Sequence, residues 1–264
     1  QDLANVSASK LIVIATHIPL ISEADDGLSE IYSGPNTENF SSLLEILEPF
    51  SNIYGIAGHD TSNSWKVEVN HSHGWQGQPW IAHTLAEVRG SGWPKGLTDA
   101  RGVKDSIMED GNPNGFYVLK FDDRNVTPDF IPFPFGPDAT QRLRITLDPP
   151  LSEIEGGSIN RGTAHTDTKI VVNLFDGGIR DLVWAFIDDG GAQAMTYTVR
   201  TDPFVERLES IYQDTDSEYS PAARSTHIWE MDLPDGLGEG LHTVRIRTED
   251  EFGQRREGAM TFEI

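Results

Sequence analysis

Residues 11–19, with the sequence LIVIATHIP, decide how the first part of the chain folds. The first five positions are apolar and three of them are β-branched, which predicts a short strand covered on both faces. Pro19 ends regular strand pairing because it has no backbone N–H, so His17 is expected at the end of this strand. The polar segment that follows, residues 22–37, predicts a long loop.

A helix and a second strand are predicted next. The helix has one apolar face, with residues spaced i, i+3, i+4 and i+7: Phe40, Leu43, Leu44 and Leu47. Asn36 or Thr37 is its expected N-cap, and Pro49 closes it. Residues 53–57, IYGIA, predict the second strand, which leads into Gly58 and His59. Parallel strands joined through a helix end at the same edge of a sheet, so we expect the histidines after the two strands to lie together.

The remainder of the chain is predicted to be mostly β-structure. Short strands are expected at residues 66–69, 116–121 and 143–147. Residues 110–115, DGNPNG, predict a tight turn, and residues 148–166 predict a linker. Residues 168–264 are expected to contain only strands and to form a small sandwich of the immunoglobulin-like kind.

The charge and composition exclude several partners and chemistries. The 264 residues include 42 acidic and 20 basic ones, for a net charge of −22, so neither nucleic acid nor anionic lipid is expected as a partner. The chain has no cysteine, which excludes thiolate catalysis, disulfides and cysteine-ligated zinc. No apolar run approaches the roughly 20 residues of a membrane span, and no membrane is expected as a partner. The lack of cysteine favours a periplasmic or secreted protein. Because the first residue is Gln1, we expect either a removed leader or a start within a longer protein.

The histidines are the main candidates for a functional site. His17 and His59 are candidate metal ligands because both follow predicted strands, although each could instead have a hydrogen-bonded structural role. His71 and His73 could hold zinc if they lay on a strand, but their Gly, Ser and Asn surroundings favour an exposed loop pair. For His83 a ligand role and a structural role both stay open. Structural roles are expected for the remaining three: His165, His227 and His242.

Other catalytic arrangements are not indicated. The chain has no Gly-x-Ser-x-Gly elbow, no phosphate-binding Gly-Lys loop and no His-Glu-x-x-His. No pair of carboxylates is singled out for sugar chemistry. Three tryptophans could stack on a sugar or a base, although a place in the core is favoured for them: Trp75, Trp80 and Trp93.

Taken together, the motifs resemble one protein family. Residues 15–20, ATHIPL, resemble the late lone-His motif of calcineurin-like metallophosphoesterases, and residues 58–61, GHDT, resemble their terminal Gly-His-x-His motif. Most of the remaining chain is similar, in order, to a bacterial subgroup with a dedicated C-terminal region. The matching segments are residues 83–93 (HTLAEVRGSGW), 108–116 (MEDGNPNGF), 172–178 (VNLFDGG), 202–204 (DPF), 227–229 (HIW) and 250–253 (DEFG).

The resemblance implies a fold and a chemistry. The fold class is expected to be α+β and mostly β. A partial metallophosphoesterase α/β sandwich is expected over residues 1–150, followed by an immunoglobulin-like β-sandwich over residues 165–264. In the intact enzyme, two divalent metal ions (Mn, Fe or Zn) would activate water for attack on a small-molecule phosphate ester. The resemblance assigns His17 and His59 as metal ligands, while Asp60 either supports a ligand or is simply exposed.

The sequence departs from the family pattern in two ways. The motifs Gly-Asp-x-x-Asp and Gly-Asn-His do not occur in the chain, and Thr61 stands where the second His of Gly-His-x-His is expected. Two or three imidazoles do not neutralise two dications, so the chain alone is expected to have little phosphatase activity and weak metal affinity, or to bind no metal. Whether it is an enzyme therefore stays open. The alternative is a non-catalytic β-rich binding or structural module of an exported protein, and sugar binding through aromatic side chains is a third option. The sequence does not indicate the substrate, the identity of the metal or the oligomeric state.

Overall fold

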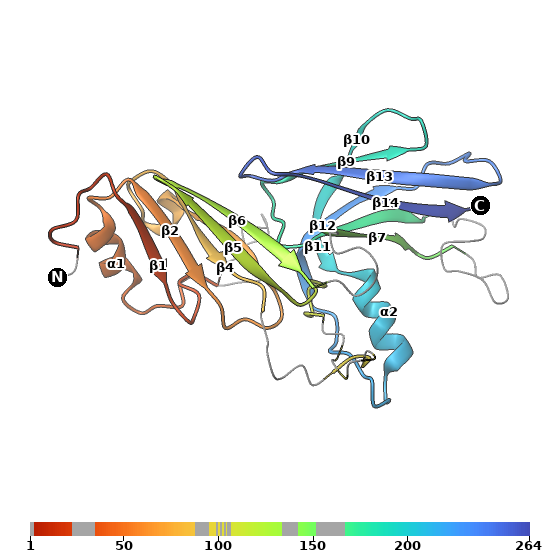
Figure 1. Cartoon of the computed structure of the whole chain (residues 1–264), viewed down its shortest axis with the longest axis horizontal. Helices are drawn as coiled ribbons and strands as arrows, with labels where there is room; N and C mark the ends of the chain where they lie inside the picture. The colour runs from red at the N-terminus through yellow and green to blue at the C-terminus, as the bar shows by residue number, and fades with distance from the viewer. Residues whose placement is uncertain are drawn as a thin grey trace.

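The computed structural model describes residues 3–22, 35–87, 95–98, 100, 102, 104, 107–133, 142–151 and 167–264. These residues form fourteen strands and two α-helices. Figure 1 shows a sheet with one helix at the N-terminal end, a hairpin, and a sandwich of two sheets at the C-terminal end. The predicted fold class, α+β and mostly β, is confirmed. No helix among the described residues has the length and apolar character needed to cross a membrane.

The first part of the chain forms a four-stranded sheet with the strand order β1-β2-β4-β3. β1 (Leu11–Ala15), α1 (Phe40–Leu47) and β2 (Asn52–Ala57) make the predicted strand–helix–strand unit, and β1 runs parallel to β2. β4 (Trp80–Thr84) is parallel to β2, whereas β3 (Trp65–Val69) is antiparallel to β4. Because β1 and β2 are parallel neighbours, their carboxyl ends lie at the same edge of the sheet.

α1 covers one face of this sheet. It packs against Ile53 and Trp80 of the sheet through three buried side chains: Phe40, Leu44 and Leu47. The predicted apolar face is confirmed, but the predicted N-cap, Asn36 or Thr37, is wrong. The helix begins at Phe40, so the residue directly before it, Asn39, takes the cap position without a side-chain capping hydrogen bond.

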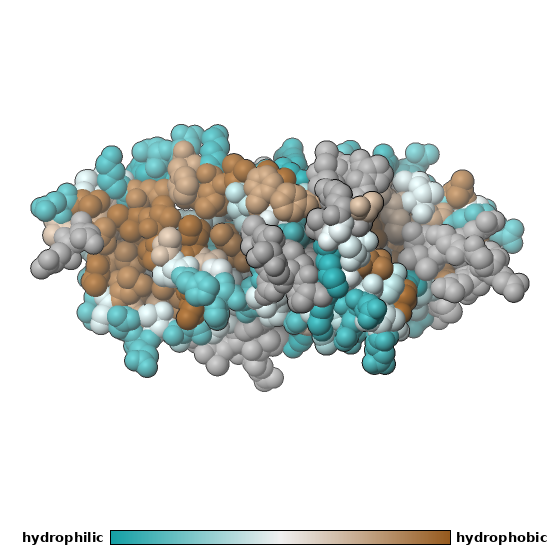
Figure 2. Space-filling model, turned by 60° about the horizontal axis from the view of Figure 1, so that its bottom comes forward, coloured by the Kyte–Doolittle hydropathy of each residue, from teal (hydrophilic) through white to brown (hydrophobic). Residues whose placement is uncertain are grey.

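The opposite face of the sheet is partly uncovered in the described part of the chain. Ile12 and Ile14 pack toward the α1 core, whereas Val13 points the other way and is 39% exposed. The hairpin of β5 (Gly115–Asp122) and β6 (Asn125–Pro132) contributes further exposed apolar side chains: Phe116, Val118 and Phe121. Figure 2 shows a broad hydrophobic area over the half of the molecule that holds β1, β2 and this hairpin. β1 is also an edge strand among the described strands.

The second part of the chain is a sandwich of two four-stranded antiparallel sheets, which confirms the predicted sandwich. One sheet has the order β11-β12-β8-β7, formed by Thr196–Thr201, Arg224–Asp232, Lys169–Leu174 and Leu143–Asp148. The other has the order β10-β9-β13-β14, formed by Gln193–Ala194, Leu182–Ile187, Leu241–Glu249 and Arg255–Glu263.

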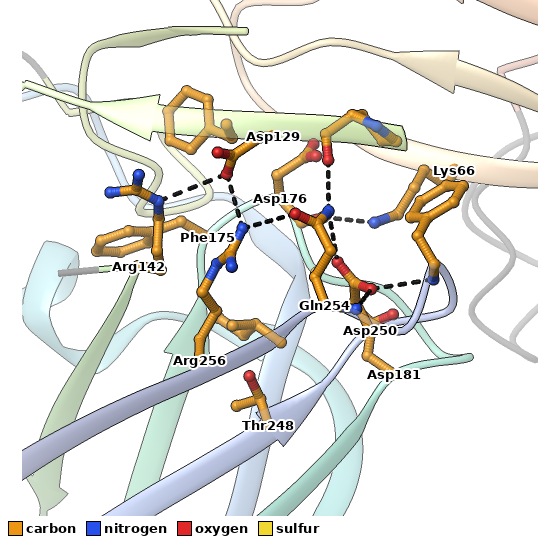
Figure 3. Close-up of a pocket in the computed structure, with 15 residues that line it drawn as sticks. Lys66, Asp129, Arg142, Phe175, Asp176, Asp181, Thr248, Asp250, Gln254 and Arg256 are labelled. Atoms are coloured by element: carbon orange, nitrogen blue, oxygen red, sulfur yellow. Dashed lines mark hydrogen bonds and ion pairs between the residues drawn. The ribbon is translucent and has the colours of Figure 1, made fainter. Parts of the chain in front are cut away.

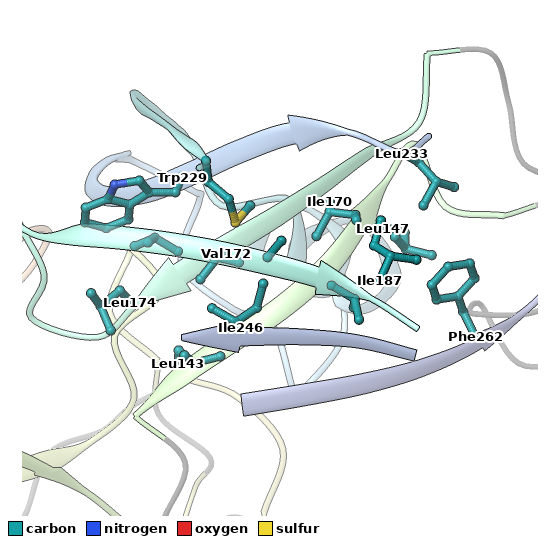
Figure 4. Close-up of a cluster of buried hydrophobic side chains, with 14 of the residues drawn as sticks. Leu143, Leu147, Ile170, Val172, Leu174, Ile187, Trp229, Leu233, Ile246 and Phe262 are labelled. Carbon is teal, nitrogen blue, oxygen red and sulfur yellow. The ribbon is translucent and has the colours of Figure 1, made fainter. Parts of the chain in front are cut away.

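The core of the sandwich lies between its two sheets (Figure 4). Ile170 and Val172 of β8 belong to one cluster with Val244 and Ile246 of β13, and all of them are 0% exposed. Burial of each such side chain contributes about 1.5–3 kcal/mol relative to exposure. This cluster is separate from the cluster around α1, so the sandwich has a hydrophobic core of its own.

One element of the sandwich differs from the sequence prediction. Only strands are predicted for residues 168–264, but α2 (Pro203–Tyr212) lies between β11 and β12. Asp202 caps this helix by accepting a hydrogen bond from the Phe204 N–H, and Pro203 takes the first helical position. An Asp-Pro pair of this kind is a known helix-start signal, and it was present in the sequence.

β7 connects the two predicted regions. It is hydrogen-bonded to β8 along its whole length, so a strand from residues 1–150 completes a sheet of the sandwich. The division into residues 1–150 and 165–264 stays a prediction, and the predicted linker lies outside the described residues from position 152 to position 166.

Candidate functional site

His17 and His59 lie just beyond the carboxyl ends of β1 and β2. Backbone pairing continues past both strand ends, since the Thr16 N–H donates to the Ile56 carbonyl at 3.0 Å. The Gly58 N–H then donates to the His17 carbonyl at 3.1 Å. The backbone therefore holds the two histidines side by side, as predicted from the topology.

The two imidazole rings are in direct contact. Nδ1 of His59 is 2.9 Å from Nε2 of His17, and the ring planes meet edge to face at 77°. Two nitrogens that each lie about 2.0–2.1 Å from one metal ion are about 2.9–3.4 Å apart in octahedral cis or tetrahedral geometry. The observed spacing thus suits neighbouring ligands of one ion as well as a hydrogen bond between two rings.

The backbone of His59 has an unusual conformation. Its φ angle is 72°, in the left-handed region that few residues other than glycine adopt. Such conformations persist only where the surrounding structure imposes them, and they concentrate at functional sites. The outlier supports a functional role for this residue.

A pocket of about 540 Å³ opens at this edge of the sheet. Its walls come from the ends of β1 and β2 and from residues 85–87 after β4. The polar side chains that line it are Thr16, His17, His59, Asp60, Thr61 and Glu87.

Asp60 shapes the turn after His59. Its Oδ1 accepts hydrogen bonds from the Ser62 N–H at 2.8 Å, the Ser62 hydroxyl at 2.7 Å and the Asn63 N–H at 3.1 Å. The side chain is therefore held by local bonds. Its charge also reaches Glu109, whose pKa is raised by burial and then by the nearby carboxylates of Asp60 and Asp110.

His83 is buried in a polar cluster next to the pocket wall. It is 1% exposed, with Nδ1 2.8 Å from the Tyr54 hydroxyl and Nε2 2.9 Å from Oδ1 of Asp176. The Tyr117 hydroxyl donates to the same Asp176 oxygen at 2.7 Å and accepts from the Ala86 N–H at 2.8 Å. Of the two roles that the sequence leaves open for His83, the structure favours the structural one. Because Ala86 lines the pocket, the cluster connects a loop of the sandwich to the pocket wall.

Asp176 is the ionised centre of this cluster. Burial raises the pKa of its carboxyl, but His83, Lys66 and the hydrogen bonds from His83 and Tyr117 together lower it to about 2. Nζ of Lys66 donates to the Asp176 carbonyl at 2.6 Å. Burial acts to lower the pKa of Lys66, yet Asp181, Asp176 and other carboxylates raise it. Figure 3 shows Lys66, Asp176 and Asp181 around a cavity of about 40 Å³, which is large enough only for water-sized molecules.

A second buried polar cluster joins the first sheet to the sandwich. Nε2 of His227 lies 3.1 Å from both Asp110 Oδ2 and Ser64 Oγ, and its Nδ1 is 2.8 Å from the Gly177 carbonyl. The Asn112 amide donates to both Ser64 Oγ and Asp110 Oδ2. His227, Asp110 and Ser64 are all 0% exposed, and the carboxylate and the hydroxyl share one ring nitrogen. In a catalytic triad they would contact opposite nitrogens, so this cluster has the structural role predicted for His227.

Comparison with known proteins matches residues 83–255 to the C-terminal part of calcineurin-like phosphoesterase. The chain belongs to the calcineurin-like phosphoesterase family. No curated protein and no solved structure gives a significant match. The matched residues of this phosphoesterase chain include Asp110, Asp176 and His227, but not His17 or His59.

The donor set for a metal ion is incomplete in the described part of this phosphoesterase chain. The family is metal-dependent in general. However, the described residues contain no group of three or more His, Cys, Asp or Glu side chains that could hold a metal ion. The two contacting nitrogens of His17 and His59 fit one edge of such a site, and Thr61 lines the same pocket where the family pattern has a histidine.

The other histidines of the phosphoesterase chain lie elsewhere. His71 and His73 are the ends of a 3₁₀ turn, η1 (His71–His73), so they do not form a His-x-His pair on a strand. His242 lies at the surface, with Nδ1 2.8 Å from Oδ2 of Asp188 and Nε2 2.8 Å from the Gly238 carbonyl. His165 lies outside the described residues.

Proposed function

We propose that this chain forms the imidazole-bearing edge and the C-terminal part of a metal-dependent phosphoesterase that hydrolyses a small phosphate ester. The observation that carries this proposal is the 2.9 Å contact between His17 Nε2 and His59 Nδ1 at the ends of two parallel strands. The family match covers residues 83–255, so the metal-ligand role of these two histidines rests on their geometry and on the motif resemblance.

The chain's own part in this chemistry is to fix the two imidazoles and to shape the pocket. His17 and His59 would hold a divalent ion, which supplies Lewis-acid activation of water at a phosphate ester. The carboxylates of Asp60 and Glu87 line the pocket and make it attractive to cations. A volume of about 540 Å³ lies in the range of small-molecule sites.

The face of the first sheet that the described residues leave partly exposed supports the same function. β1 has a free edge among the described strands, and Val13 on its uncovered face is 39% exposed. A further polypeptide segment that pairs with β1 would cover this face. It would also bring its own side chains to the strand ends where His17 and His59 lie, which is where the remaining carboxylate ligands are needed.

Removal of both histidines is expected to abolish any metal-linked stabilisation of the chain. An ion present at ten times its dissociation constant stabilises a protein by about 1.4 kcal/mol. For a chain of this size, that corresponds to a rise in melting temperature of about 2–5 °C. Thermal melts of the wild type, of the His17→Ala/His59→Ala variant and of the surface control His71→Ala, each with and without MnCl₂ or ZnCl₂, measure the effect. We expect the rise in the wild type and the control and its loss in the double variant.

The alternative function, a non-catalytic module, predicts a different result for the same thermal melts. A non-catalytic binding or structural module shows no metal-linked shift in the wild type, or the same shift in all three proteins. Hydrolysis of p-nitrophenyl phosphate provides a second test, because the incomplete donor set predicts little turnover by the 264-residue chain. Robust metal-dependent hydrolysis by this chain alone would show that its own residues complete the centre.

A further inference from the structure

A groove on the outer face of the sandwich lies apart from the phosphoesterase pocket. It crosses the sheet β10-β9-β13-β14 and has a volume of about 360 Å³. Its main lining side chains are Trp184 and Phe186 of β9, Arg247 and Glu249 of β13, and Arg255 and Glu257 of β14. None of these residues lines the pocket that contains His17 and His59.

Strand alternation places the aromatic side chains on the outside of the sandwich. Val183, Ala185 and Ile187 of β9 are buried in the sandwich core. Successive strand residues point to opposite faces, so Trp184 and Phe186 project outward, where both are only partly buried. Two aromatic side chains therefore occupy neighbouring outward positions of one strand, and we call them the aromatic strip.

Charged side chains flank this strip. Arg247 pairs with Trp184 in the β9–β13 register, and its guanidinium lies 5.0 Å from the centre of the Phe186 ring. Nε of Arg247 is 2.8 Å from Oε1 of Glu257. The aromatic strip and the hydrogen-bonding groups therefore form one surface.

Three arginines and two glutamates line the groove: Arg247 and Arg255 pair with the two glutamates, and Nη2 of Arg256 lies 2.8 Å from Oδ1 of Asp129. Besides the Arg247–Glu257 pair, Nε of Arg255 lies 2.9 Å from Oε2 of Glu249. The side chains of Arg247 and Glu257 are 58% and 69% exposed, and those of Arg255 and Glu249 are 80% and 37% exposed. Each pair therefore keeps guanidinium N–H groups and carboxylate oxygens directed to solvent, where they can donate to and accept from ligand hydroxyls.

We propose that this groove binds a neutral oligosaccharide, with Trp184 as the stacking surface and the two Arg–Glu pairs as partners for sugar hydroxyls. A pyranose has one apolar C–H face and a rim of hydroxyls, which matches an indole flanked by donors and acceptors. An anionic ligand would meet the carboxylates of Glu249 and Glu257 in the same groove and would approach a chain with a net charge of −22. An apolar peptide would desolvate the five charged side chains of the lining. Of the tryptophans that the sequence offers for stacking, Trp75 and Trp80 are core residues with 2% and 4% exposure, and Trp93 lies outside the described residues.

Isothermal titration of the full chain with neutral cellohexaose, mannohexaose and xylohexaose tests this inference, with hexagalacturonate as the charged counterpart. We expect saturable binding of at least one neutral hexasaccharide. Trp184→Ala should weaken that binding roughly tenfold or more, because buried aromatic contacts dominate such sites. Leu241→Ala is the matched control. It changes a side chain on the same β13 that is 74% exposed and lies outside the groove lining.

A second variant separates loss of the ligand contact from loss of the fold. Glu257→Gln removes one charge-assisted contact from a largely exposed position, so it should leave the urea midpoint unchanged and still weaken binding by a few fold. No binding of the neutral probes at millimolar concentration, preferential binding of hexagalacturonate, or an unchanged affinity in Trp184→Ala would each overturn the inference. Since none of these variants touches His17 or His59, the outcome is independent of the metal-linked melts.

Discussion

Asp110→Ala is expected to lower the free energy of unfolding by about 3–5 kcal/mol, the usual cost of removing one partner from a buried charged pair. Asp110 is 0% exposed, and its Oδ2 accepts from the Ser64 N–H at 2.8 Å and lies 3.1 Å from His227 Nε2. Its Oδ1 accepts from the Asn112 N–H at 2.8 Å. Alanine would leave a buried imidazole and two backbone N–H groups without these acceptors.

The same variant is expected to change how stability depends on pH. Burial acts to lower the pKa of His227, but the hydrogen bond and charge of Asp110, with the Gly177 carbonyl, outweigh burial and raise the pKa above 6.5. A raised pKa in the folded state gives stabilisation that is fully present below the unfolded value and is lost as the pH rises through the folded value. The wild type should therefore lose this contribution as the pH rises from about 6 through the raised pKa. In Asp110→Ala, burial still acts to lower the pKa of His227 and Asp110 no longer opposes it. The loss of stability with rising pH should therefore disappear.

Urea unfolding at about pH 5.5 and about pH 8, on either side of the ordinary histidine pKa, measures both effects. Asp232→Ala is the matched control, because Asp232 also pairs with a cation, Lys169, but its side chain is 86% exposed. The control should cost less than about 1 kcal/mol. If Asp110→Ala costs no more than the control, the buried cluster does not hold the first sheet to the sandwich.

Local patterns explain why the placement of His17 and His59 could be predicted. The apolar run before His17, the helix face after it and the second strand before His59 are each visible within a few residues. The parallel strand–helix–strand topology then places both strand ends at one edge. The sequence could not show the 2.9 Å contact between the rings or the left-handed backbone of His59, since both depend on how the loops close.

The role of His83 could not be predicted because its partners are distant in the chain. Asp176, which contacts its Nε2, lies 93 positions away on a loop of the other sheet system. In the sequence, Asp176 belongs to residues 172–178, VNLFDGG, which indicate a family resemblance and not a buried carboxylate. The buried carboxylate is revealed only when Tyr117 and Lys66 are brought to the same place by long-range packing.

The failure to predict α2 has a different cause. Its N-cap signal at Asp202-Pro203 is local and readable, but the strands on both sides favoured an all-β prediction for the region. The caps of short helices carry information that the surrounding pattern does not.

β7 shows the opposite case: its strand character is visible in the sequence, but its partner sheet is not.

Asp176→Asn is expected to lower the free energy of unfolding by about 2–4 kcal/mol at neutral pH, because the buried Lys66 and the donors of His83 and Tyr117 lose their charged partner. Asn has nearly the same shape as Asp, so the fold should persist while the charge is lost. The affected cluster extends through Tyr117 to Ala86 in the pocket wall, and the variant should therefore also lower the order of residues 85–87. Amide hydrogen exchange at the Ala86 N–H, which is bonded to the Tyr117 hydroxyl, measures that local effect.

The free energy of unfolding measured at acidic pH tests whether the charge of Asp176 causes the expected destabilisation of Asp176→Asn. Folding lowers the pKa of Asp176 from its usual 3.8 to about 2. A lowered pKa gives stabilisation that is present above the unfolded value and is lost as the pH falls through the folded value. The difference between wild type and Asp176→Asn should therefore shrink by about 2 kcal/mol between about pH 5 and about pH 2. Asp232→Asn, at a position 86% exposed, should follow the wild type throughout. If the curves of wild type and Asp176→Asn instead stay parallel, the charge of Asp176 does not stabilise the cluster, and its contribution comes from shape and neutral hydrogen bonds alone.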